Sequence, residues 1–427
     1  MEDKYLVKPH QNFNAEVDIP GSKSVANRAL ILAAFAEGET ILRNMLFSDD
    51  TRYMMAALKK LGNEVEIDET NKVVKITGNK NREFNVSEDI FVGNAGTAMR
   101  FLPSYIATGS GSVTLTGIER MKQRPIKDLA EALLQMGVNI EYTENEGFPP
   151  IKINACGVNA QEVVVKGNMS SQYLTSILMA APYFKNDITI KIDGNLVSIP
   201  YVNITIKMME DFGVKVENRE NREFFIKSGQ KYTAKDYIVE GDCSSASYFF
   251  GMAAMTKSSV KVNNVKKDAM QGDIKLLEVL EKMGAEIEYG DNFVIVRGTD
   301  SLNGITVDMH HMSDVAQTLS VVAMFAKGKT EIQNVYNMRI KETDRIKAVY
   351  NELTKLGAKV TELHDGLIIE PVEKYNEVVE IDTYDDHRMA MSFSLAGLKV
   401  TGTIIKDPGC VSKTFPNYFD EFEKIYK

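Results

Sequence analysis

The chain has 427 residues, of which 44% are hydrophobic and 26% are charged, and its formal net charge is −9. This length exceeds what one hydrophobic core usually serves, so the sequence predicts two domains. The acidic balance argues against a general nucleic-acid surface, but a net charge averages over the surface and leaves room for a local cationic pocket.

The cysteines and the apolar runs exclude several further classes. Cys156, Cys243 and Cys410 lie far apart, which fits neither a zinc ribbon, nor an iron–sulfur cluster, nor a secreted disulfide framework. The first residues do not combine a basic segment with an apolar run, as a signal peptide would. The longest apolar run, Ala29 to Ala36, is too short to span a bilayer. We therefore expect a cytoplasmic protein without a membrane or nucleic-acid partner.

Charged, amphipathic helices that end in glycine recur along the chain, and a short β run follows each. They contain, in chain order, the segments that begin at Leu58, Leu133, Met208, Leu280 and Leu353, with the glycines Gly62, Gly137, Gly213, Gly284 and Gly357. The glycines recur about every 70–75 residues, which indicates duplicated units. Each glycine is expected to end its helix where the chain turns left-handed.

A second kind of helix alternates with the first and carries Ala, Leu and Met nearly all round, which predicts burial. These helices fall within residues 22–36, 94–108, 170–184, 244–256, 313–326 and 385–397. The chain thus holds about six units of a βαβαββ kind, which is an α/β fold with three units per domain.

Two steps in the chain are candidate crossovers between the domains. Pro20-Gly21 and Glu240-Gly241 each stand just before a buried helix. We expect residues 1–20 and 241–427, with both termini, to form one domain and residues 21–240 the other. The active site is expected in the cleft between them.

The starts of the buried helices carry glycines, hydroxyls and cations that core packing does not require. A helix N-terminus attracts anions, and glycines beside hydroxyl residues let backbone N–H groups approach phosphate closely. The starts are GSKS at 21–24 with Arg28, GNAGT at 93–97 with Arg100, SSQ at 170–172, SD at 313–314 and DDHR at 385–388. Each one alone also fits an ordinary N-cap, and for the SDVAQ helix the cap is either Asp314 or Ser313.

Three charged motifs complete this pattern, and each taken singly also fits a solvated face. They are RMKQRP with Arg120, Lys122 and Arg124, NMRIKETDR with Asn337, Lys341, Glu342 and Arg345, and CVSKTFP with Lys413. Lys341 and Arg345 are four residues apart, which predicts that they share one helical face.

The sequence contains no Walker A motif, no GxGxxG after a strand and no HExxH. His310 and His311 are interpreted as strand-end residues. We expect neither a cofactor nor a metal.

Ten segments together resemble the motifs of the EPSP synthases, the 3-phosphoshikimate 1-carboxyvinyltransferases, over essentially the whole chain. They are PGSKSVANRALILAA, GNAGTAMR, RMKQRPI, SSQYLT, VSIPYVNIT, EGDCSSASYF, MQGDI, KETDR, YDDHRMAM and SKTFPNYF. The resemblance implies two inverse αβ barrel-like domains built from six units, with two chain crossings between them. It also implies transfer of the enolpyruvyl group of phosphoenolpyruvate to the 5-hydroxyl of shikimate 3-phosphate, in aromatic amino acid biosynthesis.

The resemblance also assigns substrate contacts. Bringing two polyanions together requires a cationic pocket, in which arginine suits planar oxyanions and lysine acts as a point charge. For shikimate 3-phosphate the contacts are Lys23, Ser24, Arg28, Ser170, Ser171, Gln172, Ser198, Tyr201, Asp314, Asn337 and Lys341. For phosphoenolpyruvate they are Lys23, Asn94, Gly96, Thr97, Arg124, Gln172, Arg345, Arg388 and Lys413.

Two carboxylates are assigned to proton transfer. Asp314 is the base at the 5-hydroxyl and Glu342 protonates C3 of the enol, because the two steps need groups with opposed tasks. Lys23 or another cation assists the departing phosphate.

The chain departs from the family pattern at Phe101, where proline is common, and at Met338, where tryptophan is frequent. Glyphosate, the family's inhibitor, occupies the phosphoenolpyruvate pocket, and we expect the chain to be sensitive to it despite Phe101. Met338 is expected to have no functional consequence.

Two alternatives stay open beside this interpretation. UDP-N-acetylglucosamine enolpyruvyl transferases share the fold and the donor, but carry a reactive cysteine on a mobile loop, which none of the three cysteines matches. A non-catalytic, repeat-built binding protein would have lost the charged helix starts and the Asp/Glu pair. No exposed apolar stripe is evident, so a monomer is expected.

Overall fold

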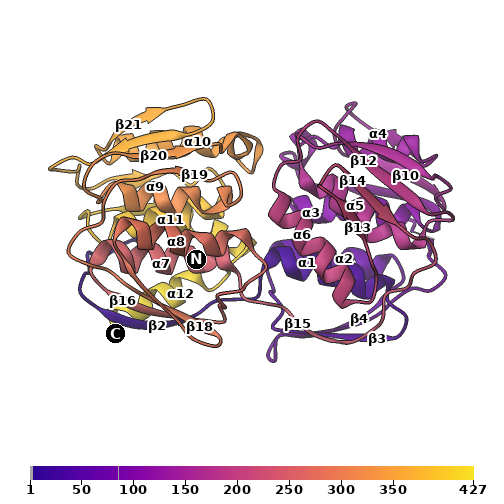
Figure 1. Cartoon of the computed structure of the whole chain (residues 1–427), viewed down its shortest axis with the longest axis horizontal. Coiled ribbons are helices and arrows are strands. Elements are labelled where there is room, and N and C mark those ends of the chain that lie inside the picture. Colours follow the sequence, from indigo (N-terminus) through magenta and orange to yellow (C-terminus); the bar gives the residue numbers. More distant parts are fainter. Residues whose placement is uncertain (1–2, 85) are drawn as a thin grey trace. The chain divides into compact units, whose positions relative to one another are not determined.

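The computed structural model describes residues 3–84 and 86–427. Their contacts divide the chain into two compact units, which Figure 1 shows in full. The terminal unit comprises Met1–Pro20 and Glu240–Lys427, and the central unit comprises Gly21–Val239.

The described strands of the central unit form three sheets. The first has the order β15 (Asp236–Ile238), β3 (Glu39–Arg43), β5 (Val73–Thr77), β4 (Glu64–Asp68). The second has the order β6 (Glu83–Phe84), β8 (Ser110–Thr116), β10 (Ile151–Cys156), β9 (Asn139–Tyr142), and β7 (Ile90–Phe91) also pairs with β8. The third has the order β11 (Glu162–Lys166), β12 (Ile188–Asp193), β14 (Glu223–Ile226), β13 (Glu217–Arg219).

The described strands of the terminal unit also form three sheets. The first has the order β17 (Glu286–Tyr289), β18 (Phe293–Arg297), β16 (Ser259–Asn263), β2 (Asn14–Asp18). The second has the order β19 (Thr306–Asp308), β20 (Thr330–Gln333), β22 (Leu367–Glu370), β21 (Lys359–Glu362). The third has the order β1 (Lys4–Leu6), β24 (Ile404–Lys406), β23 (Glu380–Ile381). In each unit, a four-stranded sheet combines one parallel pair with antiparallel pairs, as in β15–β3–β5 and β2–β16–β18. The predicted α/β class, with repeated units shared between two halves, is confirmed.

The predicted apolar helices form the cores of the two units. In the central unit they are α1 (Lys23–Phe35), α3 (Gly96–Ala107) and α5 (Ser171–Ala180), and in the terminal unit α7 (Cys243–Thr256), α9 (Ala316–Ala323) and α11 (His387–Ala396). Nearly every residue of these helices is buried, which confirms the prediction made from their composition. Within the described ranges, no helix has the length and hydropathy that crossing a membrane requires.

The charged helices each keep exposed residues beside a buried face, and they end as predicted. They are α2 (Asp49–Lys60), α4 (Lys127–Gln135), α6 (Ile199–Asp211), α8 (Leu276–Met283) and α10 (Arg345–Lys355). The glycine that follows each one has a positive φ, between 83° and 116°. Only glycine adopts this conformation without strain, so the five glycines are structural.

The expectation that Lys341 and Arg345 share a helical face is wrong. A 3₁₀ turn at Tyr336–Ile340 stops before Lys341, and α10 begins at Arg345. The side chain of Asp344 accepts a hydrogen bond from the backbone N–H of Lys347, and this cap starts the helix after the motif. The KETD segment is therefore a non-helical connection.

Gly137 provides a test of the left-handed helix ends, because its φ is 83° and a Cβ there would meet no atom within 4 Å. Substitution by alanine therefore changes only backbone strain. We expect Gly137→Ala to lower the free energy of unfolding by about 1–2 kcal/mol, and Gly137→Asn to lower it less. Denaturant unfolding measures both variants, and an alanine variant as stable as the native chain would contradict the assignment.

Candidate active site

The start of α1 places two of the predicted cations in the central unit. Lys23 is the first residue of α1, and its ammonium lies 3.6 Å from a carboxylate oxygen of Asp50 in α2. Arg28, one turn later, is 2% exposed and donates hydrogen bonds to Thr205 Oγ1 at 2.8 Å and to the carbonyl oxygen of Ser24 at 2.8 Å. A third bond, of 3.2 Å, goes to the carbonyl oxygen of Tyr201.

Phe101, the departure from the family pattern, is part of this arrangement. Its ring is fully buried, and the guanidinium carbon of Arg28 lies 5.4 Å from the ring centre. Tyr201 lies near the same guanidinium, 5.9 Å from its ring centre. Burial lowers the pKa of Arg28 to about 10, which still leaves it charged at neutral pH. The aromatic ring at 101 thus supports the position of Arg28.

The start of α3 brings the next group together. Arg124 donates to the carbonyl oxygen of Asn94 at 3.0 Å and to its side-chain oxygen at 3.1 Å. Arg100 donates to the carbonyl oxygen of Gly96 at 3.1 Å. A Cβ on Gly96 would lie 2.6 Å from a guanidinium nitrogen of Arg124 and 2.7 Å from one of Arg100. A side chain at 96 would therefore have to displace the two guanidinium groups that approach its backbone.

The starts of α5 and α6 carry the predicted hydroxyl groups. Ser170 caps α5 through its side chain, which accepts a 3.3 Å hydrogen bond from the backbone N–H of Gln172. Ser198 precedes α6 with a φ of 55°, an uncommon conformation for a residue with a side chain. Strained backbone of this kind concentrates at ligand-binding positions. Ser171 is buried, whereas Gln172 is partly exposed.

Two buried hydroxyls near these helix starts lack a partner among the residues that the structure describes. They are Ser22 Oγ, at the N-cap of α1, and Thr97 Oγ1, in the first turn of α3. A buried hydroxyl without a partner is costly, so such groups mark places where a ligand is expected to complete the hydrogen bonding.

In the terminal unit, both carboxylates assigned to proton transfer contact the guanidinium of Arg345, together with Asp386. Arg345 is 2% exposed and contacts three carboxylates: Asp386 at 2.7 Å, Glu342 at 2.8 Å and Asp314 at 3.2 Å. Burial alone would lower the pKa of Arg345, but the charges of Asp386, Glu342 and Asp314 outweigh it and raise this pKa.

Both carboxylates assigned to proton transfer have further cationic partners. Asp314 lies 3.1 Å from Arg388 and 3.7 Å from the ammonium of Lys341. Glu342 lies 3.7 Å from the ammonium of Lys413. Asp314 belongs to the 3₁₀ turn Ser313–Val315, and the N-cap positions of this turn and of α9 are Met312 and Val315, so neither Asp314 nor Ser313 stands at an N-cap position.

Asn337 completes this group through its side-chain amide. It donates a 2.9 Å hydrogen bond to Ser313 Oγ, beside Asp314. Its side-chain oxygen is buried and has no hydrogen-bond partner among the residues that the structure describes.

Asp273 joins the cluster although the sequence analysis gave it no role. It is 4% exposed, and Ser244 donates a short hydrogen bond to it. Ser244 in turn accepts a 3.3 Å hydrogen bond from Arg388, which also contacts Asp314. Burial, and then the nearby charge of Asp314, raise the pKa of Asp273 to about 7.

Three acidic residues of the site were not predicted as site residues from the sequence, and each contacts a partner that is distant in sequence. Asp50 faces Lys23, Asp386 faces Arg345 and Asp273 lies beside Ser244. The sequence signals were the DDHR helix start, which contains Asp386, and the MQGDI and YDDHRMAM segments, which contain Asp273 and Asp386. No candidate metal cluster of His, Cys, Asp and Glu occurs among the described residues.

The fold of repeated α/β units, with cations at the helix starts, is that of an enolpyruvyl transferase. The solved structure of EPSP synthase from Acinetobacter baumannii is similar, with a TM-score of 0.83 and 26% identity, over 99% of this chain and 98% of that one.

Sequence comparison defines the family more narrowly. The family model described as EPSP synthase (3-phosphoshikimate 1-carboxyvinyltransferase) matches residues 7–422. The 3-phosphoshikimate 1-carboxyvinyltransferase of Vibrio atlanticus is 49% identical over 99% of both chains, and that of Shewanella woodyi is 50% identical over 96% of both. The chain belongs to the EPSP synthase family.

The raised pKa of Asp273 predicts a pH-dependent cost to stability. In the folded chain the carboxyl keeps its proton up to about pH 7, whereas the ordinary pKa of an aspartate side chain is 3.8. The unfolded chain therefore loses this proton first, and stability falls as pH rises between these two values. Asp273→Asn mimics the neutral form, so we expect its advantage over the native chain to grow by roughly 2–4 kcal/mol across this window.

Thermal or denaturant unfolding of the native chain and the variant at several pH values measures this difference. Asp300→Asn is the matched control, because the side chain of Asp300 is fully exposed. A difference between Asp273→Asn and the native chain that does not change with pH would show that Asp273 titrates normally.

Proposed function

We propose that the chain transfers the enolpyruvyl group of phosphoenolpyruvate to the 5-hydroxyl of shikimate 3-phosphate and releases phosphate. The observation that carries this proposal is that Arg345 contacts both Asp314 and Glu342. Each carboxylate also contacts a second cation, which is Arg388 for Asp314 and Lys413 for Glu342. Two carboxylates held beside several cations suit a reaction that moves two protons between polyanions.

The central unit supplies groups suited to a phosphate and a carboxylate. Ser170, Ser171 and Ser198 offer hydroxyls at helix starts, where unpaired backbone N–H groups also favour an anion. Together with Ser24, Arg28, Gln172 and Tyr201 they are proposed to hold shikimate 3-phosphate, and Asn337 and Lys341 of the terminal unit to serve the same substrate.

Phosphoenolpyruvate is proposed to use the α3 start and the terminal cations. The guanidinium of Arg124, beside Gly96, is already positioned by its hydrogen bonds to Asn94. Binding therefore costs less conformational entropy of this side chain. The complete proposed set is Lys23, Asn94, Gly96, Thr97, Arg124, Gln172, Arg345, Arg388 and Lys413.

The chemistry is addition followed by elimination. The 5-hydroxyl oxygen attacks C2 of phosphoenolpyruvate and gives its proton to Asp314, while Glu342 delivers a proton to C3. In the second step Glu342 takes a proton back from C3, the double bond forms again and the C2–O bond to phosphate breaks, and the phosphate leaves with the proton that Asp314 had taken up. Lys23 is proposed to stabilise the departing phosphate, since a compact ammonium suits that charge.

The test of the reaction is release of inorganic phosphate from purified protein given both substrates, with each substrate omitted in turn. Release that requires both is expected. Release with UDP-N-acetylglucosamine in place of shikimate 3-phosphate would instead establish the related transferase, and binding without turnover would support a binding protein.

The carboxylate assignments predict a loss of turnover without a loss of binding. Asp314→Asn and Glu342→Gln should each lower kcat by about 10²- to 10⁴-fold, the range that a positioned acid or base supplies. Substrate binding is measured separately by calorimetry. Glu331→Gln, in strand β20, is the matched control and should keep native turnover. Near-normal turnover in either site variant would remove that residue from proton transfer.

Glyphosate is proposed to inhibit the chain in competition with phosphoenolpyruvate, as the family's inhibitor does. Phe101 packs against Arg28, whereas Gly96 meets Arg124 and Arg100, so the departure at 101 leaves the contacts of Gly96 in place. We therefore expect the apparent KM for phosphoenolpyruvate to rise with glyphosate concentration. A native chain that resists glyphosate, together with an inhibited Phe101→Pro variant, would contradict this expectation.

A further inference from the structure

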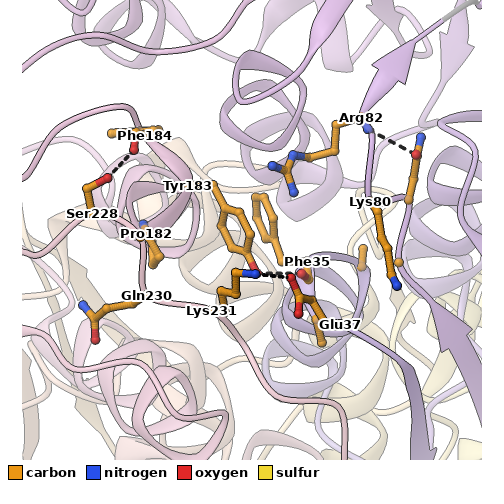
Figure 2. Close-up of a pocket in the computed structure, with 15 residues that line it drawn as sticks. Phe35, Glu37, Lys80, Arg82, Pro182, Tyr183, Phe184, Ser228, Gln230 and Lys231 are labelled. Atoms are coloured by element: carbon orange, nitrogen blue, oxygen red, sulfur yellow. Dashed lines mark hydrogen bonds and ion pairs between the residues drawn. The ribbon is translucent and has the colours of Figure 1, made fainter.

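A pocket of ≈ 300 Å³ lies in the central unit, at the C-terminal ends of two of its buried helices (Figure 2). Its walls come from the end of α1, the turn Ala181–Tyr183 after α5, and the segments that follow β5 and β14. Lys23 and Ser171 stand at the opposite ends of α1 and α5. A helix of 13 residues is about 20 Å long, so this pocket is separate from the candidate substrate residues of the central unit.

One of the residues that line the pocket is an arginine whose guanidinium lies over aromatic rings. Phe35 and Tyr183 are stacked, with their ring centres 4.6 Å apart. The guanidinium carbon of Arg82 lies 4.6 Å from the ring centre of Tyr183, and Figure 2 shows the side chain reaching toward these rings. Tyr183 is itself fixed, because its hydroxyl donates a 2.6 Å hydrogen bond to the carbonyl oxygen of Phe35.

Arg82 differs from the other stacked arginines in its hydrogen bonding. In the described part of the chain the arginines that lie over aromatic rings are Arg28, Arg52, Arg82, Arg100 and Arg219. The other four donate to oxygen atoms of the chain through their guanidinium groups. Within residues 3–84 and 86–427, the guanidinium of Arg82 donates no hydrogen bond, and its Nε is buried without a partner.

A guanidinium that is stacked on one face and unbonded at its edge is a receptor for an oxyanion. Its planar N–H groups match the two oxygens of a carboxylate or phosphate, and stacking has already removed much of its freedom. A buried N–H without a partner is costly unless a ligand accepts from it.

The other charges of the pocket favour the same kind of ligand. Lys80 and Lys231 also line it, and Glu37 is the carboxylate among the lining residues. Glu37 pairs with Lys231 at 2.6 Å, and both side chains are more than half exposed. The hydrogen bond from Lys231, with the nearby charge of Lys80, lowers the pKa of Glu37, so Glu37 remains an anion that competes for Lys231.

We propose that this pocket binds a small molecule through a carboxylate or phosphate group, which Arg82 holds at its guanidinium edge with Lys80 and Lys231 beside it. The volume lies at the lower end of the range for ligand sites, so the ligand is small. The site is additional to the proposed transferase site and does not depend on it.

The proposal is tested on the full-length chain with inorganic phosphate and with malonate, titrated separately at low ionic strength. The signal is the Nε–H resonance of Arg82, which is assigned by its absence in Arg82→Gln. We expect a saturable shift with a half-saturation of about 1–10 mM for at least one anion. A shift with phosphate alone supports a phosphate ligand, and a shift with malonate alone supports a carboxylate ligand.

Charge variants then distinguish a ligand site from a structural arginine. Lys80→Gln should weaken anion binding by about threefold, because it removes one attractive charge. Glu37→Gln should tighten it by about threefold to tenfold, because Lys231 loses its competing carboxylate. Arg219→Gln is the matched control: Arg219 also lies over a ring, Phe225, but it is paired with Glu217 and Glu223, so binding at Arg82 should not change.

Three results would overturn the proposal. They are no saturable shift with either anion, an equal shift with chloride at the same ionic strength, and half-saturation that is unchanged in both Lys80→Gln and Glu37→Gln. Both of these variants alter exposed side chains, so the test does not depend on whether Arg82→Gln folds. Because binding is read at Arg82 itself, a failure of the proposed transferase activity would not affect the result.

Discussion

The guanidinium of Arg345 ties three helix starts of the terminal unit together. Arg345 is the first residue of α10. Its carboxylate partners are Asp386 at the N-cap of α11, Asp314 in the turn before α9, and Glu342. A charge buried this deeply is tolerated only when it is paired, and removal of one partner would leave the others uncompensated. The position of each carboxylate is therefore fixed by the same ion cluster that the fold requires. The ion pairs that compensate the buried charge of Arg345 therefore also position Asp314 and Glu342, the two groups proposed for proton transfer.

The central unit also buries arginines, but it satisfies them with neutral groups instead of carboxylates. Arg28 and Arg100 are also buried, but their hydrogen bonds go to a hydroxyl and to backbone carbonyl oxygens. Neutral acceptors satisfy the N–H groups without cancelling the positive charge. An anionic ligand that approaches Arg28 or Arg100 thus meets a positive charge that no carboxylate among the described residues balances, whereas Lys23 already faces Asp50 and Arg345 is shared among three carboxylates. The two units therefore balance their buried arginines with different chemical groups.

The sequence predicted the features that depend on local pattern. The period of the helices, the burial of the Ala- and Leu-rich set and the glycine helix ends follow from spacing and backbone preference, so they were visible without a structure. The pairing of Asp50 with Lys23, the place of Asp273 beside Ser244 and the stacking of Arg28 on Phe101 depend on how distant segments pack. The KETD segment looked helical because its spacing fitted a helix, but the cap at Asp344 determines where α10 begins.

The partners of Asp314 also bear on when it acts as a base. Arg345, Arg388 and Lys341 all lie within 4 Å of its carboxylate, and positive charge close to a carboxylate opposes its taking a proton. Arg388 and Lys341 are also proposed to hold substrate anions. A substrate that attracts these two cations leaves Asp314 with less positive charge around it, and this favours proton uptake at the moment when the hydroxyl is in place. Arg345 cannot leave in the same way, because Asp386 and Glu342 hold it in the core of the unit. In the proposed mechanism, substrate binding and the readiness of Asp314 for proton transfer are linked through the same two side chains.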